Sequence, residues 1–292
     1  RSTLFPYTTL FRSRSLMKGN FTGGVDIKGG KFYQEQDLMD ECKGQAYKDI
    51  KALWKWYSDN VNDSNRDSIE KVVDERMEPL QKKYAADLLA YAKQHSDQEC
   101  IALLIDELDD VKDKETLISL MADNVKNGRM KAYYEPIFER AKKRAEMEEK
   151  AKVVQASGVE ASDFTLNDIN GKPFSLSSLR GKYVVIDFWG SWCIWCIKGM
   201  PKMKEYYEKY KGKFEILGVD CNDTEVKWKA AVEKHQLPWI HVYNPKGSDV
   251  LDKYAVQGFP TKIVIGPDGK IVKTIVGEDP AFYTLLDEVL GK

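Results

Sequence analysis

Apolar residues recur at intervals of three and four through the first half of the chain, as on the buried face of a helix. The first stripe consists of Leu38, Cys42, Ala46, Ile50, Leu53, Trp54 and Tyr57. The same spacing continues over residues 69–88, 101–108, 117–125 and 133–150. Because such stripes need partners to bury them, we expect an all-α domain of four to six helices over residues 37–152. Pro79 should kink or break the second helix, since it removes a backbone donor.

The pattern changes to α/β from residue 163 onward. Short apolar runs of strand character cover residues 182–189, 214–220, 238–243, 261–265 and 270–276, and helical patterns cover 198–211 and 280–290. Turn residues at 167–171 and 266–269 each predict a hairpin. We therefore expect residues 163–292 to form a mixed sheet flanked by helices, with a largely parallel centre and an antiparallel edge.

Three further segments complete the division of the chain. Residues 1–13 resemble the translation of a sequencing adapter, and we expect them to play no part in folding. Residues 14–36 are rich in glycine and are expected to be irregular or the remnant of a strand region. Residues 153–162 lose periodicity and predict a linker.

Composition excludes several classes of partner. The chain has 292 residues, enough for two cores, and 45 basic residues against 46 acidic ones. Such a balance gives no overall attraction to nucleic acid or to anionic lipid. The sequence contains no apolar run of 18 residues that would span a membrane.

Two of the five cysteines, Cys193 and Cys196, lie three residues apart where a strand pattern gives way to a helix pattern. Unpaired amides at a helix N-terminus stabilise a thiolate, so we expect Cys193 to be the exposed nucleophile. Cys196 lies one turn further along and is expected to be the shielded thiol that resolves a mixed disulfide.

Other uses of the five cysteines are less consistent with the sequence. A structural zinc site needs four ligands, and no second cysteine pair accompanies the scattered His95, His235 and His241. A permanent structural disulfide would not use the stabilisation of a thiolate that this position offers. Cys42 and Cys100 belong to helical stripes and are expected to be buried thiols, with a mutual disulfide as the alternative, and Cys221 receives no role.

The segment VVIDFWGSWCIWC resembles the active site of thioredoxin-fold proteins, and its surroundings resemble the TlpA/ResA-like thiol-disulfide oxidoreductases from about residue 162 to residue 292. The resemblance implies that Asp187 is a buried acid that assists proton transfer at the resolving thiol. A carboxyl buried in a strand should also have a raised pKa, as that role requires. Pro201 matches the proline that kinks the active-site helix of the family.

The motif GFPT, residues 258–261, resembles the cis-proline loop of the same family. The resemblance implies that the Phe259–Pro260 peptide is cis, that Pro260 packs against the disulfide, and that the backbone of Phe259 pairs with substrate. Thr261 is included among the expected substrate-binding residues.

Two positions depart from the family pattern. Many members carry a glutamate three residues after the second cysteine, where this chain has Gly199. Asp187 is therefore the expected proton carrier. The residues between the cysteines, Ile194 and Trp195, leave the redox potential open over the wide range of such proteins, roughly −120 to −270 mV.

Aromatic residues surround the cysteine pair. Trp192 and Trp195, with Phe259 nearby, are expected to form an apolar rim that contacts an extended peptide carrying a cysteine. Trp189, by contrast, is expected to be part of the core.

Together these features predict a protein thiol-disulfide oxidoreductase that needs no cofactor and no metal. Its partners would be cysteine-containing proteins and an upstream redox protein. The resemblance implies work in the periplasm or cell envelope, as a reductant. The adapter-like residues 1–13 suggest that any signal peptide or lipid-attachment cysteine was cut away before Arg14. The alternatives are a noncatalytic envelope lipoprotein with a thioredoxin scaffold, and a peroxiredoxin-like peroxidase, whose PxxxTxxC arrangement is missing here.

Overall fold

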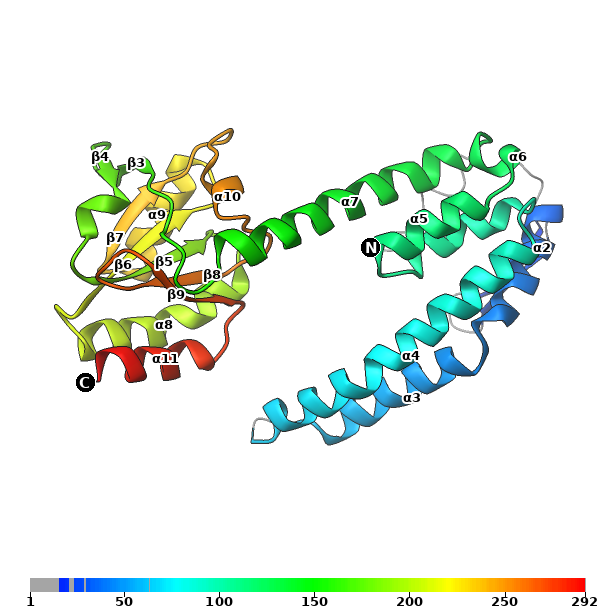
Figure 1. Cartoon of the computed structure of the whole chain (residues 1–292), viewed down its shortest axis with the longest axis horizontal. Helices are drawn as coiled ribbons and strands as arrows, with labels where there is room; N and C mark the ends of the chain where they lie inside the picture. The colour runs from blue at the N-terminus through cyan, green and yellow to red at the C-terminus, as the bar shows by residue number, and fades with distance from the viewer. Residues whose placement is uncertain (1–15, 21–23, 29, 63, 292) are drawn as a thin grey trace. The chain divides into compact units, whose positions relative to one another are not determined.

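The computed structural model describes residues 16–20, 24–28, 30–62 and 64–291, which form two compact units that meet in sequence between Lys143 and Arg144 (Figure 1). Residues 1–13, expected to play no part in folding, lie outside the described residues.

The N-terminal unit is helical after a short antiparallel hairpin. Its elements are β1 (Leu16–Asn20), β2 (Gly24–Lys28), α2 (Lys31–Asp40), η1 (Glu41–Lys43), α3 (Gly44–Asn60), α4 (Arg66–Gln94), η2 (Glu99–Asp106), α5 (Val111–Leu120), α6 (Asp123–Lys126) and the first half of α7 (Lys131–Val154). The helical region therefore begins at Lys31, earlier than expected. The segment expected to form a helix from Ile101 is a 3-10 helix, η2, and is the most buried part of this unit.

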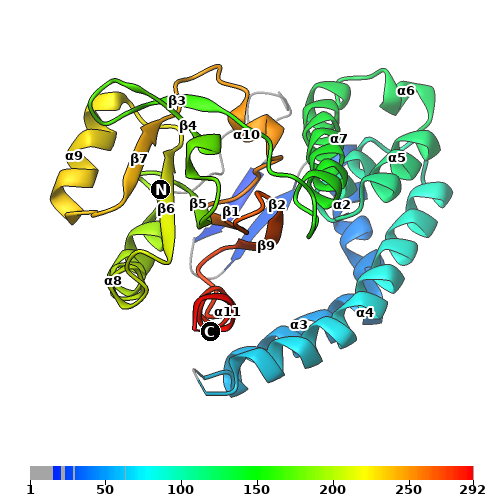
Figure 2. The same ribbon diagram turned by 60° about the vertical axis from the view of Figure 1, so that its left-hand side comes forward.

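Two of the predictions for this unit concern single residues. Pro79 does not break its helix, because α4 passes through it and has 29 residues in all. α3 runs alongside α4 (Figure 2). Cys42 and Cys100 carry no disulfide in the described part of the chain, and Cys100 is fully buried beside Ile101 in the core.

The C-terminal unit contains the mixed sheet expected from the sequence. Its elements are β3 (Thr165–Asp168), β4 (Pro173–Ser175), η3 (Leu176–Leu179), β5 (Tyr183–Trp189), α8 (Ile194–Lys209), β6 (Phe214–Asp220), α9 (Glu225–His235), β7 (Ile240–Tyr243), α10 (Val250–Lys253), β8 (Thr261–Ile265), β9 (Ile271–Val276) and α11 (Ala281–Leu290). The strands that the structure describes here lie in the order β4-β3-β7-β6-β5-β8-β9. Only the central strands β7, β6 and β5 are parallel to one another, so the parallel part is smaller than predicted.

Helices cover both faces of this sheet, as in a thioredoxin-like fold. α8 and α11 lie side by side on one face (Figure 1), where Tyr206 of α8 donates a hydrogen bond to Asp287 of α11 at 3.0 Å. α9 joins the same face through Trp228, whose ring lies 5.5 Å from that of Tyr243. The opposite face packs against η3 and α10. The thioredoxin-like fold predicted for this part of the chain is confirmed.

The segment predicted to be a linker is bound to the C-terminal unit. Gly158 and Ala161 donate backbone hydrogen bonds to Ile271 at 2.8 Å and Gly269 at 3.0 Å. Gln155, directly after α7, donates from its side chain to the carbonyl of Tyr254 at 2.6 Å. The chain therefore enters the sheet as an ordered strand-like extension beside the turn that precedes β9.

Candidate active site

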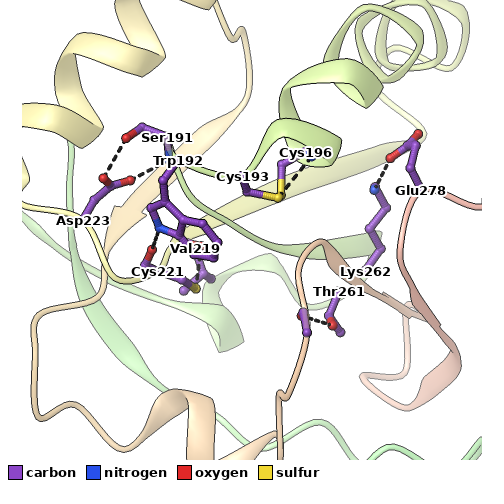
Figure 3. Close-up of a disulfide and its surroundings, with 11 residues drawn as sticks. Ser191, Trp192, Cys193, Cys196, Val219, Cys221, Asp223, Thr261, Lys262 and Glu278 are labelled. Carbon is purple, nitrogen blue, oxygen red and sulfur yellow. Dashed lines mark hydrogen bonds and ion pairs between the residues drawn. A yellow bond between two sulfur atoms is a disulfide. The ribbon is translucent and has the colours of Figure 1, made fainter. Parts of the chain in front are cut away.

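The loop between β5 and α8 holds the cysteine pair. Asp223, which follows β6, accepts two hydrogen bonds from Ser191, one from the amide at 2.6 Å and one from the hydroxyl at 2.7 Å. This clamp fixes the turn that leads into α8. Cys193 is the N-cap of α8 and forms a disulfide with Cys196, with the Cα atoms 5.3 Å apart (Figure 3).

Both sulfurs are buried in this oxidised state. Cys193 is 5% exposed and Cys196 4% exposed. The expectation of an exposed Cys193 is wrong for the disulfide form, whereas Cys196 is shielded as expected. The predicted helix-terminal setting is present, since Cys193 Sγ accepts a hydrogen bond from the Cys196 amide at 3.2 Å. That amide points at the atom that would carry the charge of a Cys193 thiolate.

The GFPT loop lies against the same region. The Phe259–Pro260 peptide is cis, as predicted. Phe259 packs against the core cluster that contains both cysteines, and Pro260 is buried. Thr261 is only 1% exposed and its hydroxyl donates to the Gly258 carbonyl at 2.8 Å. The side chain of Thr261 is therefore turned inward, and only its backbone is left for the substrate contact predicted for this residue.

An apolar rim surrounds the buried disulfide. Trp192, Ile194 and Trp195 are 52%, 62% and 58% exposed. The Trp192 ring meets Phe259 edge-on at 5.4 Å, and its Nε1 donates to the Cys221 carbonyl at 2.9 Å. Trp192 is thus held in place, whereas Ile194 and Trp195 stand on the exposed first turn of α8. We call Trp192, Ile194, Trp195 and Phe259 the apolar rim.

Lys262 and Glu278 lie on the other side of the disulfide from Trp192 (Figure 3), and Lys262 is paired with Asp187 across β8 and β5. Asp187 of β5 is 5% exposed, and its Oδ1 has no hydrogen-bond partner among the described residues. Burial raises the pKa of Asp187 to about 6, opposed by the positive charge of Lys262 and reinforced by the negative charge of Glu278. Lys262 is 1% exposed and forms an ion pair with Glu278 at 2.8 Å. A carboxyl titrating near pH 6 is suited to exchange a proton with a thiol close to neutrality.

A second buried acid lies at the end of β6. Asp220 is fully buried, and burial together with the charge of Asp223 raises the pKa of Asp220 to about 8. His241 of β7 lies on the same sheet face, where burial lowers the pKa of its imidazole to about 4. Trp189 is 1% exposed and its ring lies 5.9 Å from that of His241, so Trp189 is a core residue as expected.

Several residues of this region were not predicted from the sequence. They are Ser191, Asp220, Asp223, Lys262, Glu278 and Tyr283. One signal was available for Lys262, because a lysine stands inside the apolar run TKIVI. A second signal was Gly199, a glycine in the middle of a helix, which indicates that something approaches the helix closely.

The described residues contain no group of three or more His, Cys, Asp and Glu side chains arranged to hold a metal ion. In the same part of the chain, every helix is too short or too polar to cross a bilayer.

Comparison with known proteins places this site in a family. The sequence model of the AhpC/TSA family matches residues 157–274. The thiol-disulfide oxidoreductase ResA of a Bacillus cereus strain is 42% identical over 122 residues, which are 41% of this chain and 70% of the relative. ResA of Bacillus subtilis (strain 168) is 35% identical over 123 residues, 42% of this chain and 68% of the relative.

A solved structure is also similar to the C-terminal unit. The thioredoxin domain of a thiol-disulfide oxidoreductase from Bacteroides vulgatus is 35% identical, covers 46% of this chain and 98% of its own, and gives a TM-score of 0.44. The assignment rests on the sequence identity to ResA, which extends over more than two thirds of the length of each relative. The chain therefore belongs to the ResA family of thiol-disulfide oxidoreductases.

Proposed function

We propose that this oxidoreductase acts on cysteine-containing proteins in the bacterial cell envelope and that it works there as a reductant. The apolar rim carries the proposal. Three large apolar side chains, Trp192, Ile194 and Trp195, are each more than half exposed around a buried disulfide. An exposed apolar patch next to a reactive group favours a partner that buries it, such as an unfolded or extended peptide.

The exchange would begin at Cys193. As a thiolate stabilised by the amide of Cys196, it attacks a substrate disulfide, forms a mixed disulfide and releases the first substrate thiol. Cys196 then gives up its proton and attacks Cys193 Sγ, which closes the enzyme disulfide and releases the second substrate thiol. The two enzyme thiols are oxidised and one substrate disulfide is reduced. An upstream redox protein would restore the dithiol by the reverse exchange.

Asp187 is the proposed acceptor of the Cys196 proton. Its pKa of about 6 leaves most of it ionised at neutral pH, yet basic enough to take a proton. The proton leaves to water once the disulfide has closed.

The test separates the two cysteines. With Cys196→Ser, the mixed disulfide on Cys193 cannot be resolved, so we expect a disulfide-bonded peptide to remain attached and to be detected by mass spectrometry. Cys193→Ser should trap none. Insulin reduction with dithiothreitol should be faster with the wild type than with either variant, and equal rates would support the alternative of a noncatalytic scaffold.

The direction of electron flow is tested by the midpoint potential of the Cys193–Cys196 couple. A value close to that of thioredoxin, about −270 mV, is expected of a reductant, and a value near −120 mV would refute the proposed direction. A protease protection assay on intact cells would test the envelope location.

A peroxidase is the second candidate, because the family model that matches residues 157–274 is that of AhpC/TSA. The purified protein should consume hydrogen peroxide no faster than its Cys193→Ser variant if disulfide exchange is the reaction. Peroxide consumption that depends on Cys193 would favour the peroxidase instead.

A further inference from the structure

The residue that faces α8 behind the active site is Glu278, from the loop between β9 and α11. A Cβ atom built on Gly199 would lie 2.6 Å from Glu278 Oε1 and closer still to Oε2. Real Cβ atoms do not approach oxygen so closely, so glycine at 199 is what admits the Glu278 carboxylate to the surface of the helix. Gly199 lies one turn beyond Cys196, on the same face of α8. The carboxylate is therefore placed beside the turn that carries the second cysteine.

Two buried side chains hold Glu278 there. Lys262 Nζ lies 2.8 Å from Oε2, and Tyr283 donates a hydrogen bond to Oε1 at 2.8 Å (Figure 3 shows the lysine contact). Lys262 is 1% exposed and Tyr283 is 3% exposed. A lysine so deeply buried needs a partner for its charge, and Glu278 is the partner it contacts.

Lys262 also stands next to Asp187. The two residues are paired directly across β5 and β8, so both side chains leave the same face of the sheet. The buried ammonium group of Lys262 is thus flanked by two carboxylates, and it forms its ion pair with that of Glu278. Asp187 is left with an Oδ1 that has no hydrogen-bond partner among the described residues.

We propose that Glu278 is a positioning residue of the disulfide-exchange site. By holding the charge of Lys262, it leaves Asp187 with enough affinity for a proton to accept the one that Cys196 must lose. The inference rests on the proposed function in two respects, the assignment of Cys196 as the resolving thiol and of Asp187 as the acceptor of its proton. In this chain the carboxylate reaches the helix from another element, the loop between β9 and α11.

Other titratable groups face Asp187 from the elements packed around it. Lys262 of β8, Glu278 of the loop after β9 and Tyr283 of α11 interact with it electrostatically, as does Cys221 after β6, whose side chain belongs to the core on the opposite face of the sheet. His241 of β7 lies over Gly218, the β6 residue paired with Asp187. Burial keeps the pKa of His241 low and those of Tyr283 and Cys221 high. These three groups are therefore uncharged near pH 6, and Lys262 and Glu278 supply the charges that act on Asp187.

The test follows the resolving step with a small disulfide, dithiobis(nitrobenzoate). Cys193 attacks the reagent, and one coloured thiolate leaves. Cys196 passes its proton to Asp187, attacks Cys193 Sγ and releases the second thiolate, so that two cysteine thiols are oxidised and the reagent disulfide is reduced. Colour from other cysteines is subtracted with a variant that lacks Cys193 and Cys196. The rate of the second release is measured from pH 5 to pH 8.

In the wild type, this rate should rise with an apparent pKa near that of Asp187. In Glu278→Gln, which keeps the shape and removes the charge, Lys262 is released toward Asp187. The apparent pKa should then fall by about one unit or more, and the plateau rate should fall by roughly three- to tenfold because the base is weaker. Glu205→Gln, on the exposed face of α8, is the control and should leave the profile unchanged. A folded Glu278→Gln protein with a wild-type profile would overturn the proposal.

If Glu278→Gln does not fold, the role of the charge can be tested by moving the carboxylate from position 278 to position 199. Glu278→Ala opens the space beside α8, and Gly199→Glu in the same chain returns a carboxylate to it from the helix. This double variant should recover the wild-type profile to within about 0.3 pH unit. The matched double variant, Glu278→Ala with Gly199→Gln, has the same shape without the charge and should not recover the wild-type profile. Equal profiles for the two double variants would refute the role of the charge.

The same design separates this inference from the proposed function. The reagent is small and needs neither the apolar rim nor a protein substrate. Failure of the wild type to reduce insulin, together with a normal shift in Glu278→Gln, would refute the proposed substrate class and leave the role of Glu278 standing.

Discussion

Replacing Asp187 by asparagine should make the stability of the C-terminal unit less dependent on pH. Burial raises the pKa of Asp187 from 3.8 to about 6. The folded state therefore binds this proton more tightly than the unfolded chain does. A difference of about two pKa units corresponds to about 3 kcal/mol.

The sign follows from which state holds the proton. Below pH 3.8 the carboxyl is protonated in both states and contributes no difference. As the pH rises from 3.8 to about 6, the Asp187 carboxyl loses its proton in the unfolded chain but keeps it in the folded state, so the free energy of unfolding falls. Between about pH 4 and pH 7.5 the wild type should lose about 2 to 3 kcal/mol through this group, and Asp187→Asn should not. Asp187 is buried, so screening by solvent removes little of this effect.

The assay is guanidinium unfolding of the full chain at several pH values, followed by tryptophan fluorescence. The transition of the C-terminal unit is the one whose midpoint moves when the Cys193–Cys196 disulfide is reduced. Glu205→Gln serves as the control because this side chain is exposed on the same unit. The difference in unfolding free energy between Asp187→Asn and wild type should grow with pH. Parallel curves for the two proteins would refute the raised pKa.

Three further predictions concern the surroundings of the disulfide. Trp195→Ala should raise the KM for a peptide disulfide severalfold while leaving the reaction with a small aromatic disulfide unchanged, because Trp195 is 58% exposed on the rim; equal losses with both substrates would contradict its role. Asp220→Asn should raise the free energy of unfolding above pH 8 by up to about 6 kcal/mol, as measured by denaturant unfolding. The reason is that the pKa of Asp220 is raised from 3.8 to about 8, so ionising this carboxyl in the folded state costs free energy that the unfolded chain does not lose. Asp223→Ala removes both hydrogen bonds to Ser191 and should destabilise the fold by about 1 to 3 kcal/mol, with faster amide exchange in the loop before Cys193 as the second readout.

Much of the C-terminal unit could be predicted because local patterns determine it. A strand followed at once by a cysteine pair and a helix, a proline loop and a Pro-Asp-Gly turn are each readable from a few adjacent residues. Gly269 illustrates this, since its φ of +81° is the conformation that a glycine in such a turn supplies. The extent of parallel pairing was overestimated because strand order depends on contacts between distant segments, which periodicity does not report.

The helical unit was predicted less well at particular residues. Pro79 was expected to kink or break its helix, and the break does not occur, because α4 is continuous over 29 residues. Packing along a helix of this length outweighs the loss of one hydrogen bond. The buried segment around Ile101 forms a 3-10 helix, and an apolar run shared by the two helix types does not distinguish them.

The charged neighbours of Asp187 escaped prediction for a related reason. Asp187 was predicted as a buried acid, but its charged neighbours Lys262 and Glu278 were not, because their approach depends on the register of β5 with β8 and on the loop after β9. Glu278 is held by the sheet. Its carboxylate forms an ion pair at 2.8 Å with Lys262, which belongs to the sheet, and not with a residue of α8. Its distance from Asp187 is therefore set by the sheet, so the proton affinity of Asp187 should be insensitive to substitutions in the dipeptide between the cysteines. Variants at Ile194 and Trp195 should accordingly change the midpoint potential while leaving the apparent pKa of the resolving step in place.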